Sequence, residues 1–221
     1  MLKRLLVIIT LAMPSIVFSA QNYILDPSFN DFRLNTGESE VWISHEDSKA
    51  GLGDVGSSST NASGKDPASA FRFKKDGIGS ARIRFKKSEH NNDLSTNPGL
   101  SQIVIDLPKN KDMTYSLYYC DKEGATSPAS LYMGVRDINP GESTLSGNLI
   151  AAKLVHILEL RNAPKAKDSC FHRVSVDFNS GERGIVEVFA LLAIDNRKID
   201  GANMKKDIEI RVDDFSVRAN K

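Results

Sequence analysis

The sequence has few of the residues that enzymes and metal proteins concentrate at their sites. Its 221 residues include two cysteines, one tryptophan and four histidines, and the histidines fall in unrelated segments. His45-Glu46 lacks the second histidine, four residues further on, that a zinc metalloprotease helix requires. The chain also has no Gly-x-Ser-x-Gly nucleophile elbow and no phosphate-binding Gly-Lys-Ser/Thr loop. The sequence therefore shows no metal-hydrolase signature, nucleophile elbow or phosphate-binding loop that would indicate catalysis.

An excess of either charge is also missing. The chain has 29 Lys and Arg residues against 28 Asp and Glu residues, which gives a net charge of +1. Any basic surface must therefore be local. Beyond residue 20 no stretch approaches the roughly 20 apolar residues that a membrane-spanning helix needs, so no membrane span is expected there.

The first 20 residues have the pattern of a signal peptide. Lys3 and Arg4 supply a charged start, residues 5–18 are nearly all apolar, and small residues allow cleavage after Ser19 or Ala20. The sequence therefore predicts a signal peptide at residues 1–20 and a single domain at residues 21–221. The mature protein is expected to be secreted or periplasmic.

Two cysteines in an exported chain favour a disulfide. Cys120 closes the strand-like run 113–119, and Cys170 opens the strand-like run 171–178, so both lie at strand ends. A bridge between them would close a loop of about 50 residues and stabilise the fold by roughly 3–5 kcal/mol. The alternative is two buried, unpaired cysteines.

The dominant hydrophobic period is two, which is typical of half-buried strands. The apolar residues that share one side are expected to be Ile103, Ile105 and Leu107 in one strand, Leu131, Met133 and Val135 in another, and Val174, Val176 and Phe178 in a third. Turns rich in Gly, Ser, Asn and Pro separate such runs at the spacing of a β-sandwich. Only residues 148–160 are ambiguous, and they are predicted to form a short turn or helix that runs into a strand.

Two segments at the ends of the domain resemble a known family. Residues 22–29 (NYILDPSF) and 208–217 (IEIRVDDFSV) resemble the opening and closing strands of carbohydrate-binding modules with a galactose-binding-like jelly roll. Residues 63–65, 115–119 and 170–181 resemble further segments of these modules, in the same order. The resemblance implies an all-β fold, a two-sheet antiparallel β-sandwich (jelly roll), and non-covalent binding of a polysaccharide.

The resemblance also implies a structural calcium ion where the first and last strands meet. Calcium prefers several hard oxygen ligands, and the matching or adjacent oxygen donors are Asn30, Asp31, Asp213 and Asp214. Asn30 replaces the carboxylate of the family pattern, which removes a charge from the site. The alternative is that Asp213-Asp214 belongs to a turn and Asn30 caps a bend.

Aromatic side chains are candidates for stacking on sugar rings. Trp42 is one candidate, although it could equally belong to the core. Tyr118 and Tyr132 each lie on the strand face opposite the apolar set, so both rings could face solvent. If their strands are neighbours, Tyr118, Tyr132 and Arg136 would line one concave face; alternatively, the two tyrosine rings cover the rim of the second sheet.

A predicted hairpin at residues 71–87 carries cations on one face. Phe71, Phe73, Ala81, Ile83 and Phe85 alternate with five basic residues, which include Arg72, Arg82 and Arg84. Because like charges across strands are destabilising, an anionic partner is one hypothesis. The other is that the cations protect an edge strand from unwanted pairing.

The sequence therefore predicts an exported, non-catalytic protein that binds a polysaccharide, with an acidic glycan as one possibility. An acidic glycan suits an exported protein better than nucleic acid does. The alternative is a structural or adhesion protein of the envelope or matrix that uses the same sandwich to bind other proteins. Fold alone does not decide between these functions.

Overall fold

The computed structural model describes residues 21–29, 41–45, 53–58, 80–85, 97–163, 165, 170–194 and 207–220. The predicted signal peptide lies outside these residues, as do three predicted site residues, Asn30, Asp31 and Arg72. No helix in the described part of the chain combines the length and the apolar character needed to cross a bilayer.

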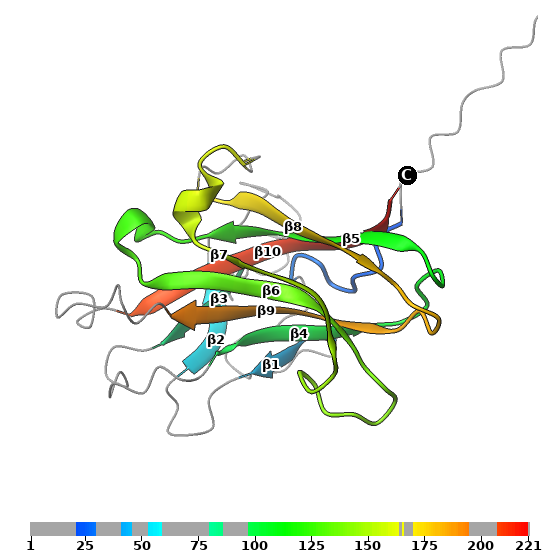
Figure 1. Ribbon diagram of the computed structural model, residues 1–221. Helices are drawn as coiled ribbons and strands as arrows, with labels where there is room; N and C mark the ends of the chain where they lie inside the picture. The colour runs from blue at the N-terminus through cyan, green and yellow to red at the C-terminus, as the bar shows by residue number, and fades with distance from the viewer. Residues whose placement is uncertain are drawn as a thin grey trace, which may run out of the picture.

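The described residues form two five-stranded antiparallel sheets packed face to face (Figure 1). The first, here called the β6 sheet, has the order β1 (Ile43–His45), β4 (Gly99–Val104), β9 (Val186–Ile194), β6 (Ala129–Asp137) and β7 (Leu149–Val155). The second, here called the β5 sheet, has the order β2 (Gly53–Ser58), β3 (Ser80–Phe85), β10 (Ile208–Ala219), β5 (Asp112–Cys120) and β8 (His172–Asn179). Within the described residues, two short 3-10 helices, η2 (Gly124–Thr126) and η3 (Ile157–Leu160), lie in the connections. The predicted all-β, two-sheet antiparallel β-sandwich is confirmed.

The core lies between the inner faces of the two sheets. Alternation places Leu131, Met133 and Val135 of β6 fully in the core, as predicted. Val174 and Phe178 of β8 are also buried. Each such side chain contributes about 1.5–3 kcal/mol through removal from water, so the period-two pattern directly stabilises the sandwich.

The prediction assigned the wrong side of β4 to the core, because the buried residues are shifted by one position from those expected. Ile103 and Ile105 are 39% and 56% exposed, whereas Leu100, Gln102 and Val104 are buried. A buried glutamine is tolerated here because both ends of its amide have partners. Gln102 accepts a hydrogen bond from the Leu25 amide (2.8 Å) and donates one to the Leu25 carbonyl (2.9 Å).

In residues 148–160, the strand and the helix occur in the opposite order to the one predicted. β7 comes first and η3 follows it. His156 forms the cap: its Nδ1 accepts from the Leu158 amide (3.3 Å), and the Glu159 carboxylate accepts from the His156 amide (3.1 Å). This reciprocal capping box satisfies two backbone donors and begins the helix after the strand.

The predicted disulfide is confirmed. Cys120, at the end of β5, is bonded to Cys170, just before β8, with the two Cα atoms 5.2 Å apart. Cys120 and Phe171 form a small buried cluster, separate from the main core, and Tyr118 packs against it. The bridge therefore joins neighbouring strands and supports an aromatic side chain of the β5 sheet.

A buried carboxyl lies immediately after this disulfide. The Asp121 carboxylate accepts a hydrogen bond from the Glu123 amide (2.9 Å), and the residue is only 5% exposed. Burial raises the pKa of Asp121 to about 6, although hydrogen bonds from Ser127 and the Glu123 backbone favour the charged form. The folded state therefore holds the proton of Asp121 more tightly than the unfolded chain does.

We expect this carboxyl to make stability depend on pH. Because the folded pKa of Asp121 lies above its unfolded value, its ionisation favours the unfolded chain. The contribution is most favourable below about pH 4, is lost as the pH rises to about 6, and amounts to about 3 kcal/mol at most. The Asp121→Asn variant keeps the acceptor oxygen but cannot ionise, so its free energy of unfolding should not fall in this way as the pH rises. Urea unfolding of both proteins from pH 4 to pH 7 measures the difference.

Asp106→Asn is the matched control for this experiment. Asp106 is exposed and has a positive φ of 59°, a conformation that asparagine tolerates. Its substitution should leave the pH dependence of unfolding as in the wild type. If the free energies of unfolding of the wild type and of Asp121→Asn changed with pH in the same way, the prediction would be contradicted.

Candidate functional site

Trp42 belongs to the core and not to a binding surface. Its side chain is 3% exposed, and its ring centroid lies 4.6 Å from that of Phe215 and 5.2 Å from that of Phe29. Its indole N–H donates to the Asp26 carbonyl (2.9 Å). The prediction that Trp42 stacks on a ligand is therefore corrected, because neither ring face is open.

The predicted grouping of Tyr118, Tyr132 and Arg136 is also wrong. Tyr118 lies on β5 and the other two on β6, which belong to different sheets. Both tyrosines are half-buried and point outward, as alternation predicted, but the outer faces of a sandwich point in opposite directions. The three side chains therefore cannot line one surface.

Tyr132 and Arg136 take part in packing on the outer face of the β6 sheet. The Tyr132 ring lies 5.1 Å from the ring of Phe189, and the Arg136 guanidinium lies 5.3 Å from the Phe189 centroid. Arg136 also donates to the Gly147 carbonyl (2.9 Å), and Glu187 accepts from the Leu145 amide (2.7 Å). These contacts hold the β6–β7 connection against the sheet.

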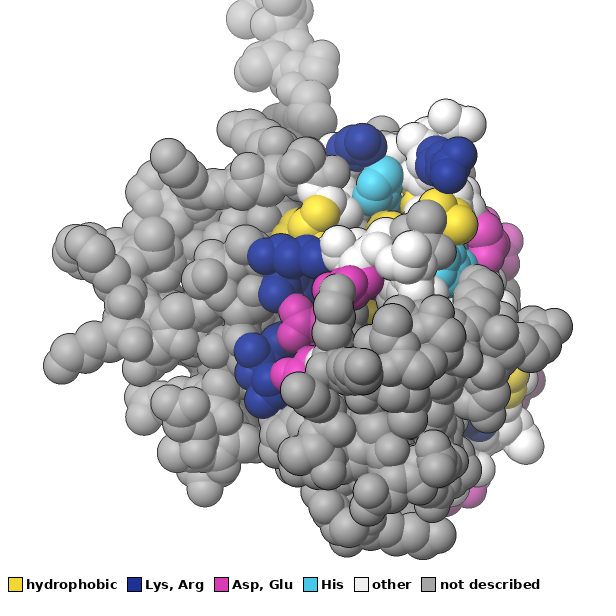
Figure 2. All heavy atoms as spheres, turned by 90° about the vertical axis from the view of Figure 1, so that its left-hand side faces the viewer, with side chains coloured by type: hydrophobic (Ala, Val, Ile, Leu, Met, Phe, Trp, Pro, Cys, Tyr) yellow, Lys and Arg dark blue, Asp and Glu magenta, His cyan; other side chains and the backbone are white. Residues whose placement is uncertain are grey.

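Arg82 and Arg84 lie on β3, which is an inner strand between β2 and β10. The hypothesis that their charges protect an edge therefore does not apply to β3. Arg84 pairs with Asp207 (2.9 Å), and Arg211, opposite Arg82, pairs with Glu209 (2.6 Å). Figure 2 shows Lys and Arg side chains interleaved with Asp and Glu side chains on the face it presents. Asp207, just before β10, thus offsets the charge of Arg84, which looks unbalanced in the hairpin sequence alone.

The two predicted calcium ligands that can be located lie at an irregularity in β10. The register shifts between Asp213 and Ser216, and Asp214 has a positive φ of 47°. An Asp213 carboxylate oxygen accepts from the Asp214 amide (2.8 Å), and the Ser28 hydroxyl donates to Asp214 (2.5 Å). Among the described residues, no three His, Cys, Asp or Glu side chains gather as a metal site. Calcium binding stays a prediction that involves Asn30 and Asp31 as well.

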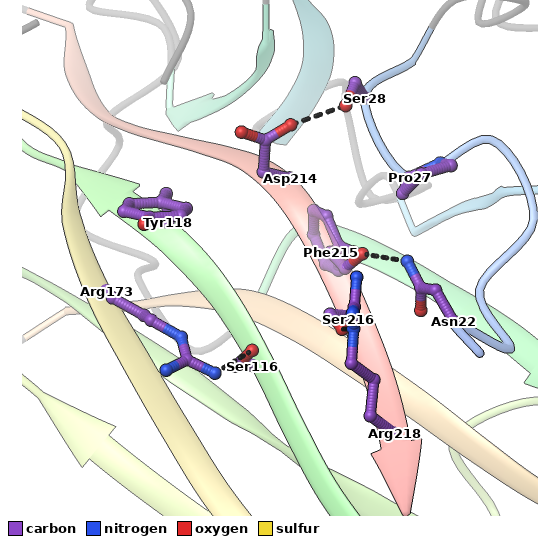
Figure 3. Close-up of a pocket in the computed structure, with 10 residues that line it drawn as sticks. All are labelled: Asn22, Pro27, Ser28, Ser116, Tyr118, Arg173, Asp214, Phe215, Ser216 and Arg218. Carbon is purple, nitrogen blue, oxygen red and sulfur yellow. Dashed lines mark hydrogen bonds between the residues drawn. The ribbon is translucent and has the colours of Figure 1, made fainter. Parts of the chain in front are cut away.

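A groove lies on the outer face of the β5 sheet, beside the first described segment (Figure 3). Its volume is about 440 Å³. It is lined by Asn22, Pro27, Ser28, Ser116, Tyr118, Arg173, Asp214, Phe215, Ser216 and Arg218. We call it the Tyr118 groove.

The order of the strands explains why this surface is hollow. In register, Ser116 of β5 lies between Ser216 of β10 and Ser175 of β8, so a row of short side chains crosses three strands. The next row contains the larger Tyr118 and Arg173, which are register partners. Large side chains beside short ones leave a depression in the sheet surface.

The first described segment, residues 21–29, forms the other wall of the Tyr118 groove. The Tyr23 amide donates to the Val217 carbonyl (3.0 Å), and the Phe215 amide donates to the Pro27 carbonyl (2.9 Å). Asn22 donates to the Phe215 carbonyl (3.0 Å), as Figure 3 shows. The two segments that resemble the family's first and last strands are therefore adjacent.

Several polar groups of the groove can reach a ligand. Arg173 is exposed and donates to the Ser116 hydroxyl at 3.2 Å, and Arg218 is exposed and donates to the Ser216 hydroxyl at 2.8 Å. Asp214 supplies acceptor oxygens at the opposite end from Arg173, beyond the Tyr118 ring (Figure 3). A half-buried ring with hydrogen-bonding groups on both sides can hold a small polar molecule that has one flat face.

Sequence reasoning named Tyr118 as a ligand-binding residue and Asp214 as a calcium ligand, but missed Arg173, Arg218 and the serines. Alternation alone places Arg173 on the outer face, because Val174 and Phe178 point inward. The missing information was that β8 and β10 are the two neighbours of β5. Strand order across a sheet depends on contacts between distant segments, which the local pattern does not contain.

Comparisons with known proteins give distant similarities only. No family model matches this sequence, and no curated protein matches it. Among solved structures, the chain is similar to the CBM22-2 xylan-binding domain of Xyn10C from Paenibacillus barcinonensis, with 14% identity, a TM-score of 0.46, and coverage of 86% of this chain and 97% of that one.

Two further solved structures have other roles. The enzymatically active domain of tailspike protein 4 from bacteriophage CBA120 has 11% identity and a TM-score of 0.49 over 90% of this chain, which spans 21% of that chain. The K1 cleaved adhesin domain of Lys-gingipain from Porphyromonas gingivalis has 13% identity and a TM-score of 0.42, and covers 83% of this chain and 94% of that one. These similarities concern the fold alone, so a function has to be argued from the groove.

We expect calcium to raise the thermal stability of the protein, with Asp214 among its ligands. A ligand that binds only the folded state raises the melting temperature by mass action; a concentration of about 100 times Kd would raise it by roughly 5–10 °C. EGTA should remove this increase, and excess calcium should restore it. The Asp214→Asn variant should show a smaller response, measured by differential scanning fluorimetry. A wild-type melting temperature that is the same with EGTA and with calcium would refute the prediction.

Proposed function

We propose that this protein is exported and binds a polysaccharide, without catalysis, in the Tyr118 groove. The observation that carries the proposal is the half-buried Tyr118 ring beside polar side chains in an open depression of the β5 sheet. A sugar ring has an apolar face bounded by hydroxyl groups. An aromatic ring suits the face, and nearby donors and acceptors suit the hydroxyls.

The polar lining has the mixed character that hydroxyl groups require. Asp214 accepts hydrogen bonds, Arg173 and Arg218 donate them, and the hydroxyls of Ser116 and Ser216 do both. A volume of about 440 Å³ lies within the usual size range of small-molecule sites. A position on an outer face of the sandwich suits a ligand that is part of a longer polymer.

The non-catalytic part of the proposal rests on the acids of the groove. Hydrolysis of a glycosidic bond typically uses two carboxyl groups, one on each side of the bond. Asp214 is the one carboxylate among the described residues that line the groove. The groove is therefore better equipped to hold a glycan than to cleave it.

Export is supported by the disulfide. Disulfides such as Cys120–Cys170 persist in oxidising compartments and are rare in the cytosol. The signal-like pattern of residues 1–20 predicts the same destination. Both observations support an envelope, matrix or environmental polysaccharide as the proposed ligand.

Affinity electrophoresis in native gels tests the proposal. Gels that contain xylan, galactan, alginate or polygalacturonate should slow the wild-type protein in at least one case. The Tyr118→Ala variant removes the stacking ring and should weaken that retention by about tenfold or more. Tyr132→Ala is the matched control, since Tyr132 is also half-buried but lies on the other sheet. Unchanged migration in every gel, or equal retention of Tyr118→Ala and wild type, would reject the proposal.

A second candidate function is protein binding through β7. This strand forms one edge of the β6 sheet within the described residues, and Leu149, Ile150 and Leu154 are 48%, 40% and 59% exposed. An apolar edge strand can pair with a strand from another chain. The same gels separate the two candidates, because a sandwich that binds only proteins migrates independently of the polysaccharide.

A further inference from the structure

Arg173 differs from the arginines of this protein that form ion pairs with described residues. Arg84, Arg183 and Arg211 form ion pairs with Asp207, Asp137 and Glu209. Arg173 forms no ion pair with any described residue, and its one hydrogen bond there is the 3.2 Å contact with the Ser116 hydroxyl. It is exposed on β8, an edge strand of the described sheet. Most of its five N–H donors are therefore available to a ligand.

The guanidinium is beside the ring that is proposed to hold the sugar. Tyr118 and Arg173 are direct register partners on neighbouring strands. Figure 3 shows both side chains in the groove, with the Arg173 guanidinium turned toward Ser116. A substituent on a sugar ring stacked against Tyr118 would come within reach of these donors.

The charges around Arg173 do not neutralise it. Asp214 lies at the other end of the groove and accepts a hydrogen bond from Ser28. Asp213, the register partner of Tyr118, is buried, and one of its carboxylate oxygens accepts from the Asp214 amide. Asp177, four residues further along β8, accepts from the Thr114 hydroxyl (2.5 Å). The Arg173 end of the groove thus keeps a positive charge.

We propose that the Tyr118 groove prefers acidic polysaccharides and that Arg173 binds the carboxylate of a uronic acid unit whose ring rests on Tyr118. The planar guanidinium fork matches a carboxylate with two parallel hydrogen bonds. The inference rests on the proposed function and names its class of ligand. It also moves the basis of acidic-glycan recognition from Arg82 and Arg84 to Arg173.

The experiment compares charged polymers with their neutral esters. The probes are polygalacturonate and alginate. Each is used with its carboxylates free and ionised, and again as the ester in which the carboxylates are blocked. Binding is measured by affinity electrophoresis and by isothermal titration calorimetry at low and high salt. The wild-type protein should bind at least one acidic polymer at least tenfold more tightly than its ester, and high salt should weaken that binding.

Variants of Arg173 identify the residue that carries the preference. Arg173→Gln should lose at least tenfold more affinity for the acidic polymer than for its ester, because the ester retains only the hydroxyl contacts of the groove. Arg173→Lys keeps the charge but loses the fork, and should bind with intermediate affinity. Arg161→Gln is the matched control, because Arg161 is exposed and lies outside the groove. Thermal melting confirms that each variant is folded.

The outcomes separate this inference from the proposed function. Equal affinity for acid and ester, or an Arg173→Gln variant that binds the acid as the wild type does, overturns the inference while leaving glycan binding intact. An equal loss for acid and ester in Arg173→Gln also overturns it, since the residue would then serve the sugar ring and not its charge. No binding to any polysaccharide, acidic or neutral, overturns both.

Discussion

The pairing of the first described segment with β10 is the constraint on which the rest of the site depends. Backbone hydrogen bonds join Tyr23 to Val217 and Phe215 to Pro27. They coincide with the irregularity of β10 between Asp213 and Ser216, and with the positive φ of Asp214. A bulged strand bends and redirects its side chains. Phe215 can therefore point into the core while Asp214 and Ser216 line the groove.

The same pairing links the core to the surface. Phe215 is the common contact of Phe29 and Trp42, with ring centroids 5.4 Å and 4.6 Å away. Burial of three large aromatic side chains is among the largest local stabilising contributions in such a fold. The wall of the groove is thus attached to a rigid part of the sandwich. A site on such a support keeps its geometry better than one on a free loop.

Local sequence patterns predicted where the strands lie in the chain better than which strands are neighbours in a sheet. The alternation of Leu131, Met133 and Val135 and the positions of the two cysteines followed from short-range chemistry, and both were confirmed. The face of β4 was misassigned because Gln102 is satisfied by Leu25, 77 residues away. Arg173 was missed for the same kind of reason, since only the strand order brings it beside Tyr118. Features that depend on long-range pairing have no local signature that alternation can reveal.

The small cluster of Cys120 and Phe171 has a consequence for the thermodynamics of recognition. Tyr118 packs against this cluster, and the cluster is closed covalently by the bond to Cys170. The ring is consequently held in place before any ligand arrives. Ordering a side chain on binding typically costs about 0.5–1.5 kcal/mol of free energy. A ring that is already preorganised avoids much of that entropic cost, so a covalent crosslink outside the groove would add to the affinity of the proposed site without touching the ligand.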